Sequence, residues 1–141
     1  MKRPIYQILE EAEALPTPAD RVRCLQENDC VALRQVLHGI YSPNAVWLLP
    51  EGPVPPELLV PPDGMIFNEP NRLHMECRRM YLFAKGGRDD LAQGRREQLF
   101  VEFVSYLPKG EQDLIISMKD KKCPYPKVTK EIVEKAFPDL L

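Results

Sequence analysis

The C-terminal run Met118–Leu141, MKDKKCPYPKVTKEIVEKAFPDLL, is the most informative stretch of the chain. A lysine-rich turn leads into Tyr125 between two prolines, and an apolar pattern follows that Pro138 ends. Thr129 is a helix-capping residue type, because its hydroxyl accepts a hydrogen bond from a free N–H of the first helical turn. The pattern therefore predicts a short capped helix that docks on the rest of the molecule. Its inward positions are Ile132, Val133, Ala136 and Phe137.

Three more helices are predicted before this run. Residues 71–87, NRLHMECRRMYLFAKGG, give the strongest helical pattern, with a Gly-Gly pair as its stop signal. We expect this segment to be a central buried helix with Tyr81 on its inward face. Apolar residues at helical spacing predict further helices over about residues 95–107 and 111–119.

The N-terminal region carries three shorter helical patterns. Residues 4–15 place apolar side chains at helical spacing between polar ones. A second helix begins with a proline at its first position, where Thr17 can accept the amide hydrogen of Asp20. Asn28-Asp29 ends this helix and can cap a third one. The apolar positions of the third helix are Leu33, Val36, Leu37 and Ile40.

Residues 42–70 interrupt the helical pattern. Eight of the 15 prolines fall within this segment, which excludes a regular helix there. The segment is either a solvated linker or an extended strap on the core, and its many apolar side chains favour the strap. Long ordered loops are frequently functional, so the segment is a candidate interaction surface.

Together these patterns predict one all-α domain over residues 1–141. We expect a compact bundle of about six to seven short helices, in residues 1–41 and 71–141, with the proline-rich loop of residues 42–70 packed on it. The composition, 44% hydrophobic and 28% charged, is typical of a globular chain. No apolar run approaches the ~20 residues of a membrane span, and glutamates near the N-terminus interrupt any signal-peptide core. We therefore expect no membrane contact and no export.

Charge is unevenly distributed along the chain. The net charge is −2, and the first 70 residues hold 5 Lys and Arg against 10 Asp and Glu, whereas the remaining 71 residues hold 14 against 11. The pI of about 5.7 is low for a dedicated nucleic-acid-binding domain, whose binding face is usually strongly basic. Nucleic acid is therefore a possible partner but not the favoured one.

Two sets of cations are candidate contacts for phosphate or for an acidic partner. Lys119, Lys121 and Lys122 precede Tyr125, and such a loop can hold a nucleic-acid backbone while the ring stacks on a base. Alternatively, these lysines complement the negative end of a helix while the tyrosine packs. The second set is Arg78, Arg79, Arg95 and Arg96. These arginines either bind phosphate or pair with glutamates of their own helices.

The sequence shows no set of residues with catalytic or metal-binding spacing. The cysteines are Cys24, Cys30, Cys77 and Cys123. They lack the paired spacing of a zinc site, and we expect free thiols. His38 and His74 lie within apolar helical patterns, where packing is commoner than catalysis. We predict no catalytic residue, no metal and no cofactor, and hence no enzyme. The alternative is a small enzyme with a pocket under the proline-rich loop, for which no catalytic group can be named.

Four segments together resemble a known family. They are Trp47–Gly52, WLLPEG; Arg78–Gly87, RRMYLFAKGG; Arg95–Val104, RREQLFVEFV; and the C-terminal run, with the motif MKDKK-x-PY-x-x-VTKE-x-V-x-x-AFP. The chain resembles a family of small uncharacterised proteins of large contractile-tailed, myovirus-like bacteriophages, including those that infect cyanobacteria. The resemblance covers most of residues 30–141 and implies a phage origin, in the host cytoplasm or the virion. It implies no activity.

The leading functional hypothesis is a non-enzymatic phage protein that acts by protein–protein contact. It is either a virion component or a regulator of a phage or host machine. The candidate contact residues are Trp47, Leu48, Leu49, Tyr125, Phe137 and Leu141. In this hypothesis the lysines near residue 120 steer the approach of the partner. The alternative hypothesis is a nucleic-acid-associated protein that uses the basic C-terminal half.

Overall fold

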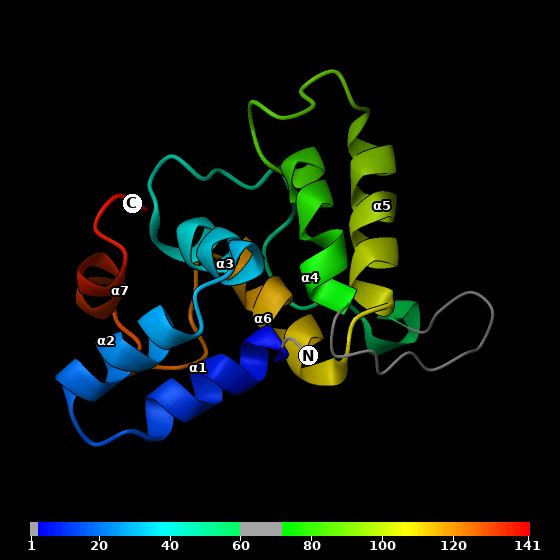
Figure 1. The fold of residues 1–141 in the computed structure, drawn as a ribbon. Coiled ribbons are helices and arrows are strands. Elements are labelled where there is room, and N and C mark those ends of the chain that lie inside the picture. Colours follow the sequence, from blue (N-terminus) through cyan, green and yellow to red (C-terminus); the bar gives the residue numbers. More distant parts are fainter. Residues whose placement is uncertain (1–2, 60–71) are drawn as a thin grey trace.

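The structure, a computed structural model, describes residues 3–59 and 72–141 and is all-α over those residues (Figure 1). The α-helices are α1 (Ile5–Ala14), α2 (Pro18–Glu27), α3 (Val31–Tyr41), α4 (Arg72–Glu76), α5 (Gln93–Ser105), α6 (Lys109–Lys119) and α7 (Lys130–Ala136). Two segments are 3₁₀ helices, η1 (Pro56–Leu59) and η2 (Cys77–Phe83). The described residues hold no strand beyond one isolated antiparallel bridge between Trp47 and Ala84. The predicted fold class, a bundle of short helices, is confirmed.

Helix α6 lies at the centre of the bundle, in contact with α1, α3 and α5. Helices α1, α2 and α7 gather on one side of it, and α4 and α5 lie on the other (Figure 1). The inward face of α6 carries Leu114, Ile115 and Met118, none of them more than 2% exposed. The central helix is therefore α6 and not the segment of residues 71–87 that the sequence pattern favours.

Two of the predicted helix caps are present. The Thr17 hydroxyl accepts the amide hydrogen of Asp20 at 3.2 Å, at the start of α2. The Thr129 hydroxyl accepts the amide hydrogen of Ile132 at 3.3 Å, at the start of α7. Each cap satisfies a backbone donor that has no partner within its helix. Both helix starts could therefore be read from local sequence alone.

The predicted cap of the third helix was wrong. Helix α3 begins at Val31 after Cys30, which makes no side-chain cap bond. The Asn28 amide instead donates back to the Cys24 carbonyl oxygen at 2.8 Å. Asp29 forms two hydrogen bonds with the Arg34 guanidinium, at 2.6 and 2.8 Å. Both side chains that were expected to cap α3 thus form hydrogen bonds with other groups.

The single long helix predicted over residues 71–87 was also wrong. Its described part is one short α-helix, α4, followed by the tighter 3₁₀ helix η2. The end of η2 is hydrogen-bonded to the loop after α3, because the Leu48 amide donates to the Phe83 carbonyl oxygen at 2.8 Å. The Phe83 ring packs edge-on against Phe100 in the core. Tyr81, predicted to face inward, is 52% exposed.

The proline-rich segment packs on the core over its described part, residues 42–59. Leu49, Val54 and Leu59 lie against the hydrophobic core, as the strap interpretation predicts. The only helical turn within residues 42–59 is the short η1. Residues 60–70 of the predicted strap lie outside the described residues. Among the helices that the structure describes, none has the length and hydropathy to cross a bilayer.

Candidate functional site

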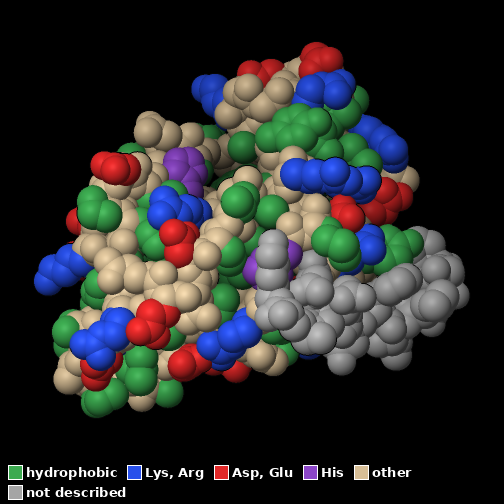
Figure 2. Space-filling view, in the orientation of Figure 1, with side chains coloured by type: hydrophobic (Ala, Val, Ile, Leu, Met, Phe, Trp, Pro, Cys, Tyr) green, Lys and Arg blue, Asp and Glu red, His purple; other side chains and the backbone are tan. Residues whose placement is uncertain are grey.

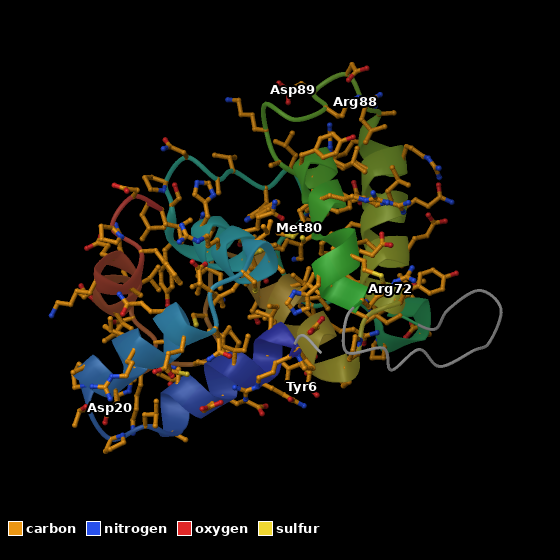
Figure 3. All side chains as sticks on the ribbon, in the orientation of Figure 1. Tyr6, Asp20, Arg72, Met80, Arg88 and Asp89 are labelled. Carbon is orange, nitrogen blue, oxygen red and sulfur yellow. The ribbon has the colours of Figure 1, made fainter. Side chains whose placement is uncertain are left out.

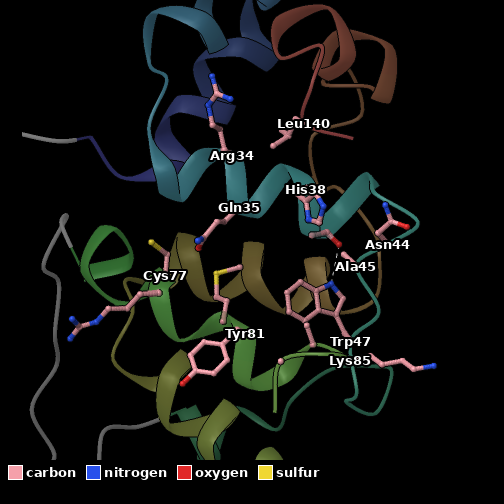
Figure 4. A pocket seen from close by; sticks show the side chains of 15 residues that line it. Arg34, Gln35, His38, Asn44, Ala45, Trp47, Cys77, Tyr81, Lys85 and Leu140 are labelled. Atoms are coloured by element: carbon pink, nitrogen blue, oxygen red, sulfur yellow. Dashed lines mark hydrogen bonds between the residues drawn. The ribbon is translucent and has the colours of Figure 1, made fainter. Parts of the chain in front are cut away.

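A cavity of about 460 Å³ opens between α3 and η2, and we call it the Trp47 groove (Figure 4). It is lined by side chains from α3, from η2, from the loops that follow these two elements, and by Leu140. Figure 2 shows the molecular surface hollowed near α3, with hydrophobic side chains exposed at the edge. Met80, a residue of η2, lies on the side of that helix next to α3, and the loop that carries Arg88 and Asp89 stands at the outer end of the molecule (Figure 3). The groove therefore separates helices of the N-terminal and C-terminal halves.

The indole of Trp47 forms one wall of the groove because Gly39 leaves room for it. A Cβ atom at position 39 would lie 2.6 Å from the indole Cζ2 and 2.7 Å from the sulfur of Met118. The indole N–H donates to the Gly39 carbonyl oxygen at 2.9 Å. Sequence reasoning selected Trp47 but missed Gly39, although a glycine inside an apolar helical pattern usually has a packing reason.

A short backbone pairing fixes the loop that carries Trp47. The Leu48 amide donates to Phe83, and the Lys85 amide donates to the Val46 carbonyl oxygen, each at 2.8 Å. These bonds flank the bridge between Trp47 and Ala84. The loop after α3 and the loop after η2 are thereby held together at the base of the groove.

The described residues that line the groove include cations and no carboxylate. Its charged residues are Arg34, Arg78 and Lys85, and His38 adds a titratable ring. Arg34 is already paired with Asp29. Arg78 and Lys85 make no side-chain hydrogen bond or ion pair within residues 3–59 and 72–141. Burial, and then the nearby charge of Lys121, lowers the pKa of His38, which favours its neutral form.

Gln35 gives the groove an unused hydrogen-bond acceptor. Its side-chain oxygen is buried and has no partner among the described residues. Figure 4 shows this side chain directed from α3 into the cavity, toward Cys77. Buried polar atoms are nearly always hydrogen-bonded, so this oxygen is suited to receive an N–H or O–H group from a ligand.

Three of the seven predicted anion contacts are occupied by carbonyl oxygens of the chain itself. The ammonium of Lys119, a residue only 6% exposed, donates to Pro50 and Gly52. The ammonium of Lys121 donates to three carbonyl oxygens at the end of α3 and just after it, at 2.7 to 2.9 Å. The buried Arg96 guanidinium donates to the carbonyl oxygens of Leu82 and Arg88 and to the Gln93 side chain. These bonds tie loops to helices; Lys119 and Arg96 are buried, whereas Lys121 is partly exposed but its ammonium is engaged by the chain.

The other four predicted cations are exposed, but only one of them lines the groove. Arg78 is that residue. Arg79 lies 3.3 Å from a carboxylate oxygen of Glu76. Arg95 donates to Gln98 at 2.9 Å on its own helix. Lys122 is exposed in the turn after α6. The pairing of Arg79 agrees with the local alternative that the sequence left open.

The predicted contact residues divide between groove, core and surface. Trp47 is half-buried in the groove wall, and Leu48 and Leu49 are half-buried beside it. Phe137 is 3% exposed, and its ring lies in the core beneath the Arg34 guanidinium. The remaining two, Tyr125 and Leu141, are half-buried. Burial raises the pKa of Tyr125 to about 12, and its hydroxyl donates to the Tyr6 carbonyl oxygen at 3.3 Å.

The arrangement is suited to binding. Within the part of the chain that the structure describes, no three His, Cys, Asp or Glu side chains are grouped as a metal site. The groove combines apolar side chains with two cations and one acceptor that have no partner among the described residues, and these are the elements of a ligand-recognition surface.

Fold and groove thus define a small protein, all-helical over its described residues, with a cationic, partly apolar cleft. The chain belongs to a family of unknown function, DUF6433, whose model matches residues 8–124. That match includes every groove-lining residue except Leu140. Neither a curated protein nor a solved structure matches the chain.

Proposed function

We propose that this protein is a non-enzymatic binding protein that acts by protein–protein contact through the Trp47 groove. In this proposal it is of phage origin, and it serves either as a virion component or as a regulator of a phage or host machine. The observation that carries the proposal is the groove itself, an apolar cleft whose lining, among the described residues, includes two unpaired cations and no carboxylate. Aromatic and methionine side chains beside arginine are the commonest anchors of protein interfaces.

The contact residues of this proposal differ from the set expected from sequence. Trp47 remains in the set of contact residues because it forms part of the groove wall. Met80 and Tyr81 are added to the set because they also line the cavity. Phe137 is excluded because it is buried in the core. Lys119 is excluded for the same reason, so it cannot steer a partner.

Nucleic-acid binding is not the function that we propose. Lys119, Lys121 and Arg96, three of the cations on which that hypothesis depended, donate to carbonyl oxygens of the chain. The free cations that remain in the groove are few, whereas nucleic-acid binding usually requires a broad basic face.

The proposal is tested by affinity capture of the full chain from infected cells, with quantitative mass spectrometry. We expect a partner at fixed stoichiometry that is lost with Tyr81→Ala. The matched control is Met75→Ala, because Met75 is 51% exposed and does not line the groove. Equal capture by both variants would remove the groove from the proposal, and the absence of any stoichiometric partner would remove protein contact altogether. Presence of the chain at a fixed copy number in purified virions distinguishes a structural component from a regulator.

A further inference from the structure

We infer that the Trp47 groove takes an acidic segment of the partner protein. An apolar side chain of that segment rests on the groove floor, and its carboxylates lie beside Arg78 and Lys85. This inference rests on the proposed function and names the chemistry of the partner.

Charge complementarity is the first argument. The chain has 21 Asp and Glu and a net charge of −2, yet no Asp or Glu of the described residues lines the groove. The side chains of Arg78 and Lys85 have no ion-pair partner in the described residues. An acidic segment would give both of them partners, whereas a basic segment would meet only like charge.

The spacing of the cations favours an extended segment over a single phosphate group. A phosphate site requires donors that converge on one point. Figure 4 shows Arg34 and Lys85 at opposite ends of the cavity, pointing away from each other. Carboxylates spread along a peptide match this spacing.

The buried oxygen of Gln35 favours a peptide for a separate reason. It needs a hydrogen-bond donor, and it has none within the described residues. A peptide backbone presents an N–H at nearly every residue, whereas a carboxylate group alone presents only acceptors at neutral pH. The floor beneath it includes Met80, a side-chain type that adapts readily to apolar ligands.

The C-terminal residues of the chain place an acid and an apolar side chain at one end of the groove, as the proposed partner segment would. Leu140 lines the cavity, and the neighbouring Asp139 adds its charge to that of Asp29 beside Arg34. An acid followed by a leucine thus already lies at the Arg34 end. The partner segment repeats that combination of acid and apolar side chain beside Arg78 and Lys85.

Direct binding to defined peptides tests the inference. The probe is an array of synthetic decapeptides that hold one Leu, Phe or Met and zero to four Glu, followed by fluorescence anisotropy on the best binder. We expect binding to rise with the number of glutamates and to fall about tenfold with the double variant Arg78→Gln, Lys85→Gln. Gln35→Met, which removes the acceptor, should also weaken binding.

The matched control is the double variant Arg23→Gln, Lys109→Gln. It makes the same change in net charge, and both of its residues are exposed outside the groove. Circular dichroism of each variant verifies that its fold is retained. Binding that is independent of glutamate content, or equal loss with the control variant, overturns the inference. Tighter binding of a twelve-residue oligothymidylate than of any peptide also overturns it, in favour of nucleic acid.

The capture experiment separates this inference from the proposed function. If Tyr81→Ala loses the captured partner but the Arg78, Lys85 double variant keeps it, the groove binds a protein that is not recognised by acidity. If neither variant loses the partner, the groove is not the contact surface and both proposals fail.

Discussion

A buried carboxylate, Glu111, is the least expected residue of the core. It is 0% exposed, and one of its oxygens accepts the Ile5 amide hydrogen at 3.0 Å, at the start of α1. The other oxygen has no partner in the described residues. Burial raises the pKa of Glu111 to about 7, and the hydrogen bond from Ile5 opposes this shift only in part.

This pKa predicts that the contribution of Glu111 to stability falls as pH rises. The carboxyl pKa is near 4.5 in the unfolded chain, so between pH 4.5 and 7 the folded state holds the proton more tightly. That stabilisation is complete below pH 4.5 and is lost by about pH 7, a difference of about 3 kcal/mol. Glu111→Gln keeps an acceptor for Ile5 and should be more stable than wild type at pH 8. Urea unfolding at pH 5, 6, 7 and 8 measures the difference.

The control for this pH series is Glu134→Gln, an exposed glutamate on α7. Its unfolding free energy should follow that of the wild type at every pH. A wild-type protein and a Glu111→Gln variant that differ by a constant amount across the series would contradict the assignment.

Gly39 carries a second prediction at the scale of one residue. In Gly39→Ala the new methyl group meets the Trp47 indole and the Met118 sulfur at less than 3 Å. We expect a loss of about 1 to 3 kcal/mol in unfolding free energy and a shift of tryptophan fluorescence. The chain has a single tryptophan, so the shift reports on this wall directly. Gly94→Ala is the control, since nothing lies within 4 Å of its Cβ position. Equal stability of the two variants would show that the indole moves freely.

At the scale of the element, a lysine distant in sequence closes the end of α3. The last carbonyl oxygens of a helix have no partner within it. The Lys121 ammonium donates to three carbonyl oxygens, that of Gly39 in the last turn of α3 and those of Ser42 and Ala45 just after it. Lys121 itself has a φ of 59°, a left-handed backbone conformation at the end of α6. Lys121 therefore takes part in the C-terminal ends of both α3 and α6.

We predict that Lys121→Gln destabilises the protein by about 1 to 3 kcal/mol, because three carbonyl oxygens lose a charged donor. Lys122→Gln is the matched control, because Lys122 is exposed next to it and makes none of these bonds. Thermal unfolding of both variants measures the difference. Similar melting temperatures would mean that water replaces the ammonium without cost.

The cap of α7 gives a further prediction at this scale. Thr129→Ala removes the hydroxyl that accepts the Ile132 amide hydrogen. The expected loss is about 1 kcal/mol, with Thr129→Ser close to the wild type. Denaturant unfolding of the two variants distinguishes the cap from the packing of the threonine methyl group.

Local sequence was sufficient where helix starts and apolar spacing determine the structure. Thr17 and Thr129 cap as predicted because a cap involves only neighbouring residues. The 71–87 pattern failed because its conformation depends on distant partners, namely the loop near Leu48 and the ring of Phe100. Propensity is a weak guide when tertiary contacts compete with it.

At the scale of the whole molecule, the groove could be predicted only in part. Trp47 and Arg78 were selected from residue type, and both line it. The cavity needs the approach of α3 to η2, and sequence spacing does not show which elements meet. The same limit hid the interior positions of Glu111 and Lys119, because charged residues on amphipathic helices are usually exposed.

The burial of Lys119 should affect how the folded protein reacts with covalent labelling reagents. Amine-acylating reagents need access to a free amine, and this ammonium is enclosed by the Pro50 and Gly52 carbonyl oxygens and by Asp120. In a brief acylation pulse, exposed lysines such as Lys130 should react first and Lys119 only when the strap lifts from α6. Lys119 is thus an intrinsic reporter of how often the native molecule opens, readable by mass spectrometry without any added probe.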